Sequence, residues 1–159
     1  MNVYEFELFE TDEDKGWILV EPFDFPGMTE GKGLSEAAYM ACDFMRMWAE
    51  AWYIDGKEPP VPTYGNTPRH PGGRILLVPM NDPKLTIRKT TPSDAARQLG
   101  ISPARVTQLV KEAKLEAFTD EFGKRWITQG SIECRLNDHL HLKHAAKRKT
   151  APLAKAAAL

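Results

Sequence analysis

The chain has 159 residues, enough for one domain or two small ones, and a formal net charge of −1. Residues 1–83 carry six Lys and Arg against fifteen Asp and Glu, whereas residues 84–159 carry fifteen against seven. No apolar run is long enough to span a membrane, the N-terminus lacks the basic start of a signal peptide, and Cys42 and Cys134 are too few for a disulfide framework. We therefore expect a cytoplasmic protein in which an acidic module precedes a basic module suited to a polyanion.

The first half predicts two strands, a long helix and a third strand. Residues 3–9 and 17–20 alternate or cluster apolar side chains around the acidic turn 11–16, which predicts a hairpin. Residues 35–55 predict a helix that ends at a glycine and the prolines after it. Residues 74–80 predict a strand at a sheet edge, because a proline lies near its end.

The predicted helix is unusually apolar. One stripe at three- and four-residue spacing comprises Ala37, Ala41, Phe44, Trp48, Ala51 and Trp52, and we expect Cys42 to be a small core residue. Two interpretations stay open: the helix packs both on the sheet and on another subunit, or it is a plain core helix of a small α+β domain.

Residues 91–115 predict two short helices joined by a glycine turn, the geometry that places one helix in the major groove of DNA. Thr91 is a suitable N-cap for the first helix, and Asp94 would complete a capping box. Gly100 supplies a turn that needs a positive φ. Ser102, followed by a proline, starts the second helix.

The apolar spacing fixes which face of the second helix points outward. A small core is expected from Ala96, Leu99, Ile101, Val106 and Leu109. The predicted DNA-contacting residues are Ser102, Pro103, Ala104, Arg105, Thr107, Gln108 and Lys111, together with Lys124 and Arg125 from a following hairpin. Arginine reads guanine and glutamine reads adenine through paired hydrogen bonds, whereas the lysine at 111 is expected to meet a phosphate.

Two strand-like runs, 116–119 and 124–128, flank a glycine-containing loop and predict a hairpin with Lys124 and Arg125 at its tip. A helix restarts over residues 131–136. This order resembles the winged helix-turn-helix of the excisionase and MerR-like families over about 45 residues. The resemblance implies a wing that touches the phosphates flanking the groove.

The last part of the chain is a basic tail, residues 139–159, whose Ala and Lys content predicts disorder with residual helicity and a non-specific attraction to DNA. His139, His141 and His144 lack Cys or carboxylate partners at fixed spacing. We therefore expect no metal site there, and no cofactor in the protein.

Residues 1–80 resemble the HicB antitoxin family. The resemblance rests on Pro22, Asp24, Pro26, Gly27, Thr29 and Gly31, then Ser35-Glu36-Ala37-Ala38, Trp48, Gly56 and the exit Pro59-Pro60-Val61-Pro62. It implies a small β-β-α-β unit, a reduced relative of the RNase H-like fold, followed by a separate DNA-binding domain. It also implies a partner, a basic HicA-like ribonuclease toxin that the acidic domain would attract and neutralise.

The chain departs from that family's pattern at the start of its helix. A Gly-Asp-Thr run is usual there, whereas this chain has Gly31-Lys-Gly33-Leu34, with Gly33 as a tolerable cap. Many members also carry a different DNA-binding domain. A cognate toxin is therefore less firmly implied than the fold.

An active RNase H-like nuclease would need carboxylates converging on divalent cations, and the available ones are Asp12, Asp14, Asp24 and Glu36. The first two lie in an exposed turn, and the others belong to motifs that fix loop and helix geometry. We predict no enzymatic activity.

The resulting hypothesis is a DNA-binding antitoxin and repressor of the α+β class, acting as a homodimer or higher oligomer on operator DNA. Its parts are an interaction domain (1–83), a winged helix-turn-helix domain (84–138) and the basic tail (139–159). The alternatives are an orphan regulator, a phage-type excisionase that bends DNA, and a protein–protein adaptor without a toxin.

Overall fold

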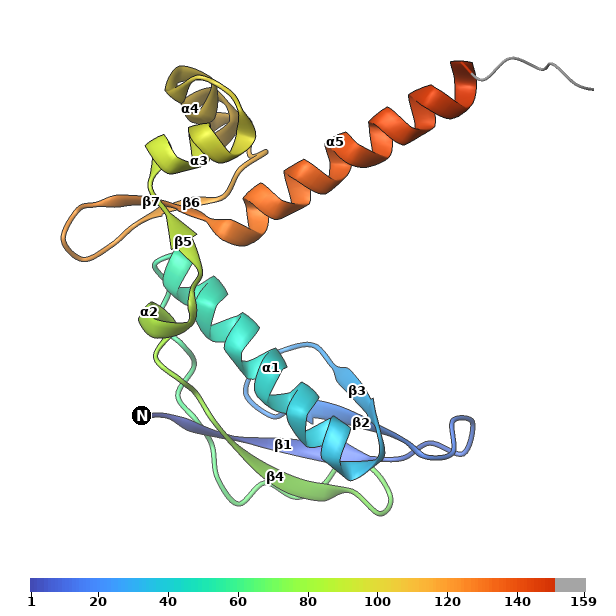
Figure 1. The fold of residues 1–159 in the computed structure, drawn as a ribbon. Coiled ribbons are helices and arrows are strands. Elements are labelled where there is room, and N and C mark those ends of the chain that lie inside the picture. The colour runs from blue at the N-terminus through green and yellow to red at the C-terminus, as the bar shows by residue number, and fades with distance from the viewer. Residues whose placement is uncertain (151–159) are drawn as a thin grey trace, which may run out of the picture. The chain divides into compact units, whose positions relative to one another are not determined.

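The computed structural model describes the backbone of residues 1–150 and the side chains of residues 1–139. The chain divides into two compact units, Met1–Ile87 and the residues from Arg88 onward (Figure 1). The sequence-based boundary lies four residues earlier, because the pair Asp82-Pro83 predicts a break between domains. In the structure the same pair caps the short helix α2 (Pro83–Thr86), which belongs to the first unit. Within the described residues, no helix combines the length and the apolar character needed to cross a membrane.

The first unit is a four-stranded antiparallel sheet with one long helix on it (Figure 1). Its strands are β1 (Val3–Phe9), β2 (Trp17–Pro22), β3 (Thr29–Lys32) and β4 (Arg74–Pro79), in the order β3-β2-β1-β4, and its helix is α1 (Gly33–Ile54). The predicted edge position of β4 is confirmed. The predicted β-β-α-β order is wrong, because β3 makes it β-β-β-α-β.

Strand β3 escaped prediction because its four residues are mostly polar and include a glycine. Gly31 is the one residue of β3 that is buried. A Cβ atom at Gly31 would lie 2.3 Å from the backbone nitrogen of Ala37, so only glycine lets the strand approach the start of α1 this closely.

The core of the first unit lies between α1 and one face of the sheet. Buried residues of β1 on that face are Tyr4, Phe6 and Leu8, and those of α1 are Ala37, Ala41, Met45, Ala49 and Trp52. The predicted stripe was correct at Ala37, Ala41 and Trp52. Phe44 and Trp48 pack against this core half-buried, whereas the prediction was wrong at Ala51, which is exposed. Cys42 is exposed and is not a core residue.

The second unit combines a three-stranded antiparallel sheet with three helices (Figure 1). Its elements are β5 (Lys89–Thr90), α3 (Pro92–Leu99), α4 (Pro103–Lys111), β6 (Ala117–Thr119), β7 (Arg125–Thr128) and α5 (Gln129–Thr150), with strand order β5-β7-β6. The protein is therefore of the α+β class, as predicted. The two-residue strand β5 was too short to recognise from sequence.

Helix α5 is much longer than expected. It continues to Thr150, so the predicted disorder of the tail is wrong for residues 139–150. Residues 145–149 are all alanine, lysine or arginine, which favour helices and extend α5. The rest of the predicted tail, residues 151–159, lies outside the described part of the chain.

The small core of the second unit is the predicted one with additions from the sheet and α5. Ala96, Val106 and Leu109 are buried, and Leu99 and Ile101 pack against them half-buried. Ala95, Leu115, Ile127 and Ile132 complete the cluster. Helices α3 and α4 are thus held on the sheet through their inner faces.

Candidate nucleic-acid interface

Helix α3 begins at the predicted cap. The hydroxyl of Thr91 accepts a hydrogen bond from the backbone N–H of Asp94 at 3.1 Å and donates one to the Asp94 carboxylate at 2.7 Å. In the predicted capping box this carboxylate would instead accept from the backbone N–H of Thr91. The cap therefore forms with a changed pattern of hydrogen bonds, and Asp94 also pairs with Arg97.

The turn between α3 and α4 is closed by Gly100, as predicted. Gly100 has φ +65°, the left-handed conformation that favours glycine. The backbone N–H of Ile101 donates to the carbonyl of Ala96 at 3.0 Å, which satisfies an orphan carbonyl of the last turn of α3. The turn thus sets the direction in which α4 leaves α3.

Helix α4 starts at Ser102, whose hydroxyl accepts from the backbone N–H of Arg105 at 3.2 Å. Its outer face is open to solvent: Ser102, Pro103, Ala104, Thr107, Gln108 and Lys111 are all exposed. The hydroxyl of Thr107 donates to the carbonyl of Pro103, leaving its methyl group and oxygen lone pairs outward. The structure therefore brings these predicted residues together on one exposed face.

Arg105 differs from the other residues of this face. Its side chain is only 39% exposed, and its guanidinium lies 3.4 Å from a carboxylate oxygen of Glu112. Glu112 also pairs with Lys114 at 2.9 Å, and these contacts hold the pKa of its carboxyl below the ordinary value, chiefly through the hydrogen bond from Lys114. Sequence reasoning missed this carboxylate, although its position one turn beyond Gln108 was visible.

The hairpin of β6 and β7 places its basic residues beside the tip rather than at the tip. Arg125 is the first residue of β7 and pairs with Thr119, and Lys124 precedes it. The tip itself carries Phe122, which is 86% exposed. The prediction of two cations at the tip is therefore wrong in detail: the backbone N–H of Asp120 donates to the carbonyl of Lys124 at 2.9 Å, so the tip consists of residues 121–123.

A single carboxylate organises the hairpin loop. Asp120 accepts hydrogen bonds from the backbone N–H groups of Phe122 and Lys124 and from the indole N–H of Trp126, at 3.0, 2.9 and 2.7 Å. These bonds, the indole one foremost, hold the pKa of Asp120 below its ordinary value. The loop is thus an ordered projection.

Two lysines lie over the ring of Trp126. The Nζ atom of Lys124 is 4.1 Å from the ring centroid, and that of Lys89, from β5, is 5.2 Å away. Cation–π contacts of this kind position the charges without neutralising them. The hairpin and β5 therefore present two ammonium groups over the ring of Trp126, and Arg125, the neighbouring residue of β7, is also exposed.

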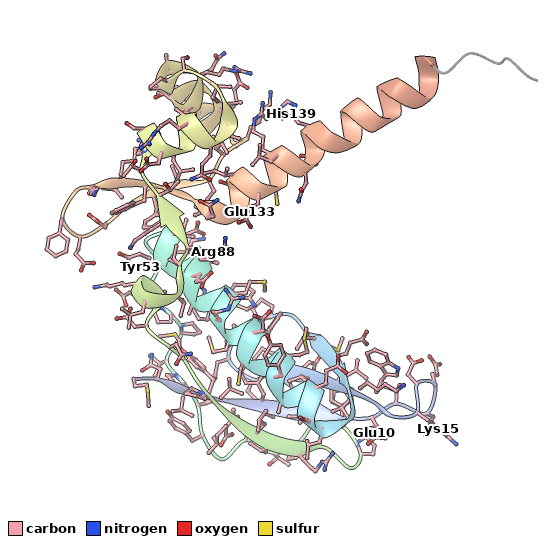
Figure 2. All side chains as sticks on the ribbon, viewed as in Figure 1. Glu10, Lys15, Tyr53, Arg88, Glu133 and His139 are labelled. Atoms are coloured by element: carbon pink, nitrogen blue, oxygen red, sulfur yellow. The ribbon has the colours of Figure 1, made fainter. Side chains whose placement is uncertain are left out.

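Helix α5 is fastened to the sheet by an ion pair between Arg88, just before β5, and Glu133, with N–O distance 2.5 Å; both residues are labelled in Figure 2. The side-chain amide of Gln129 also donates to that of Gln98 on α3 at 2.8 Å. The start of α5 is therefore tied both to β5 and to α3.

The positive charge of the second half is unevenly distributed. Residues 88–139 carry nine Lys and Arg against seven Asp and Glu, whereas residues 140–159 carry five against none. Within the described side chains Lys111, Lys124 and Arg125 form no ion pair. The candidate interface thus contains a few placed cations, while the sequence has its largest excess of basic residues in 140–159.

No protein-family model matches this chain, and a search of curated proteins finds no match. The resemblances to HicB antitoxins and to winged helix-turn-helix families therefore stay predictions.

The carboxylates considered for metal-dependent catalysis do not converge. Asp12 and Asp14 are exposed in the turn after β1. Asp24 accepts from the backbone and hydroxyl of Thr63 at 3.1 and 2.7 Å, and Glu36 accepts from the backbone N–H of Lys32 at 2.9 Å. Asp24 thus holds the loop around Thr63, and Glu36 holds the start of α1.

The histidines of the tail give no cluster that can be described. His139 is exposed on α5 (Figure 2), and the side chains of His141 and His144 lie outside the described part of the chain. Among the described residues, one group with suitable ligand atoms for a metal is Glu7, Glu21 and His70, which sequence reasoning did not find.

Proposed function

We propose that this protein is a DNA-binding transcriptional regulator whose second unit is a winged helix-turn-helix. Helix α4 would lie in the major groove and the β6–β7 hairpin would contact the flanking backbone. The observation that carries the proposal is the exposed polar face of α4 on a pair of capped helices joined through Gly100.

The side chains of that face have the chemistry of base and phosphate contacts. Gln108 offers the paired donor and acceptor that match adenine, and the methyl of Thr107 suits the methyl group of thymine. Lys111 lies one turn further along the same face, where its ammonium group would reach a phosphate. Arg105 would read guanine once its guanidinium leaves Glu112.

The hairpin would add contacts that carry no sequence information. Lys124 and Arg125 are exposed and form no ion pair within the described residues, so their charges are available to phosphates. Since one short recognition helix contacts few bases, two copies of the chain on a repeated operator would give useful specificity. We therefore propose a homodimer or higher oligomer as the active form.

For the first unit we propose the role of an antitoxin, with a fold that is a reduced relative of the RNase H-like fold. Support comes from the HicB-like motif residues, of which Gly31 meets a demonstrable steric need, and from charge. Residues 1–83 carry nine more acidic than basic residues, which favours a basic, RNA-binding partner such as a HicA-like toxin.

Selection of duplexes from a random pool by the full chain tests the DNA-binding proposal. We expect an enriched motif, an affinity that falls steeply with salt, and loss of the preference at one position in Gln108→Ala. Lys57→Ala, which removes an exposed cation of the first unit, is the matched control for Lys111→Ala. The absence of both enrichment and salt dependence would leave the adaptor interpretation.

The antitoxin role needs a separate test. Co-expression with the product of an adjacent short reading frame should relieve the growth arrest which that product causes alone. Growth arrest that persists, with operator binding intact, would indicate an orphan regulator.

A further inference from the structure

The outer face of the first sheet carries two glutamates where an apolar or solvated surface would be usual. Because side chains alternate along a strand, Glu5 and Glu7 of β1 point away from α1. Glu5 accepts from the backbone N–H groups of Gly65 and Asn66 at 2.9 and 2.8 Å, and Glu7 accepts from that of His70 at 2.8 Å. The segment between α1 and β4 is therefore fastened over the sheet by buried carboxylates.

Glu7 is the unusual member of the pair, since its side chain is 0% exposed. Burial raises the pKa of its carboxyl, but hydrogen bonds from the backbone of His70 and Arg69 outweigh that effect and leave the pKa below its ordinary value. Glu7 thus places a carboxyl group in the protein interior, where a charge without a partner is costly.

One oxygen of this carboxylate lacks a hydrogen bond. Glu7 Oε2 and Nδ1 of His70 are both buried atoms without a hydrogen-bond partner, and they lie 3.3 Å apart. The imidazole ring stacks on Phe9 with centroids 3.6 Å apart, which holds its orientation. Two atoms that bind metals therefore face each other, and the near neighbours of Glu7 Oε2, Nδ1 of His70 at 3.3 Å and Nε of Arg69 at 3.5 Å, lack hydrogen-bond geometry.

A second carboxylate lies beside them. Glu21 of β2 is directly opposite Glu7 in the register, an arrangement in which like charges repel. Arg69 lies near both, with Nε 3.5 Å from Glu7 and a terminal nitrogen 3.8 Å from Glu21, and neither contact is a hydrogen bond. The same guanidinium donates to the carbonyl of Pro22 at 3.1 Å.

We propose that Glu7, Glu21 and His70 bind a single zinc ion. Each residue offers one ligand atom, and these atoms all lie within 4.8 Å of one another. An imidazole nitrogen and two carboxylate oxygens are a ligand set that zinc accepts, with a fourth position for water. For bonds of about 2.0–2.1 Å, neighbouring ligands of a tetrahedral ion are roughly 3.3 Å apart.

The loop around Glu7 is shaped for close approach. A Cβ atom at Gly73 would lie 2.3 Å from Glu7 Oε1. The backbone N–H of Gly73 donates to the carbonyl of His70 at 3.1 Å, which closes the loop next to the histidine. The ion would therefore join β1, β2 and this loop, and stabilise the segment over the sheet.

Arg69 is the competitor in this arrangement. Its side chain is 48% exposed, and its guanidinium also lies 4.5 Å from the ring centroid of Phe23. It can therefore move away from the carboxylates while keeping contacts of its own. Zinc and the guanidinium of Arg69 compensate the same negative charge, so removal of the guanidinium should favour the binding of zinc.

Zinc titration of the full chain against a chromophoric chelator tests the proposal. We expect one ion per chain, with affinity reduced more than about 100-fold in His70→Ala and in Glu21→Gln, because loss of a partner one shell further out already costs 10–100-fold. Arg69→Ala should bind zinc more tightly than the parent chain. Glu21 and His70 are chosen because both side chains are partly exposed, whereas replacing Glu7 would disturb the fold.

The tail histidines supply the matched control. The chain has four histidines, so a variant with His139, His141 and His144 all replaced by alanine retains His70 alone. Binding at full strength in this variant, with the visible absorption of tetrahedral Co²⁺ after substitution, would support the site. Loss of zinc binding in this triple variant would overturn the proposed site. Unchanged zinc binding in His70→Ala and Glu21→Gln would also overturn it, provided that circular dichroism shows both variants to be folded.

Discussion

Replacing Arg105 by alanine separates sequence recognition from simple charge attraction. In the free protein its guanidinium lies 3.4 Å from Glu112, and exposed ion pairs of this kind contribute little to stability. The unfolding midpoint of Arg105→Ala should therefore stay close to that of the parent chain. DNA binding should change much more, because a paired contact to guanine discriminates by about 1–3 kcal/mol.

That energy corresponds to a dissociation constant roughly 5- to 150-fold higher on the selected duplex. Fluorescence anisotropy with the selected duplex and with single-base variants measures it. On a duplex that lacks the critical guanine, the parent chain and Arg105→Ala should bind alike. An equal loss on every duplex would make Arg105 a phosphate contact, and no loss on any would remove it from the interface.

Glu112→Gln is the companion variant. It removes the carboxylate that holds Arg105 and a negative charge near the proposed phosphate path, so affinity should rise on all duplexes. A fall in affinity would mean that Glu112 positions Arg105 for binding rather than competing with the bases.

Three further predictions follow from the second unit. Lys124→Ala should weaken binding evenly across sequences and reduce the salt slope by about 1, and an effect confined to one sequence would refute its phosphate role. Gly100→Ala should destabilise the fold by about 1–2 kcal/mol in denaturant unfolding, because φ is +65° there while a Cβ would meet no neighbour; unchanged stability would contradict the strained turn. Asp120 has a lowered pKa, so the loop contacts it makes are fully present above its ordinary value and are lost as the pH falls through the lowered one. The indole N–H resonance of Trp126 should report that transition, and a midpoint at or above the ordinary aspartate value would refute the contribution of the indole bond.

The two-helix segment was predictable because its signals are local. A cap residue, a proline in the first turn and a glycine at a left-handed position each act within a few residues, and all are realised around Thr91, Gly100 and Ser102. The spacing of apolar residues then gave the buried face of α4 correctly. The pairing of Arg105 with Glu112 was missed because periodicity says which way a side chain points and not which partner it finds.

Features that depend on distant segments were not predictable. Strand β3 is polar and forms because β2 offers a free edge. Met45 and Ala49 of α1 are buried although the predicted stripe omits them, because the sheet determines which face of the helix is covered. The meeting of Glu7, Glu21 and His70 depends on the register of two strands and on the path of a loop. No spacing along the chain indicates it.

The distribution of charge offers the sharpest alternative to the proposed interface, since residues 140–159 contain five Lys and Arg and no Asp or Glu. Nuclear magnetic resonance of the isotope-labelled full chain, titrated with the selected duplex, distinguishes DNA binding through α4 from DNA binding through residues 140–159. We predict that the amide resonances of Thr107, Gln108 and Lys111 shift on binding. Shifts confined to residues after 139 would show that DNA is bound by the basic tail, and would contradict recognition through α4.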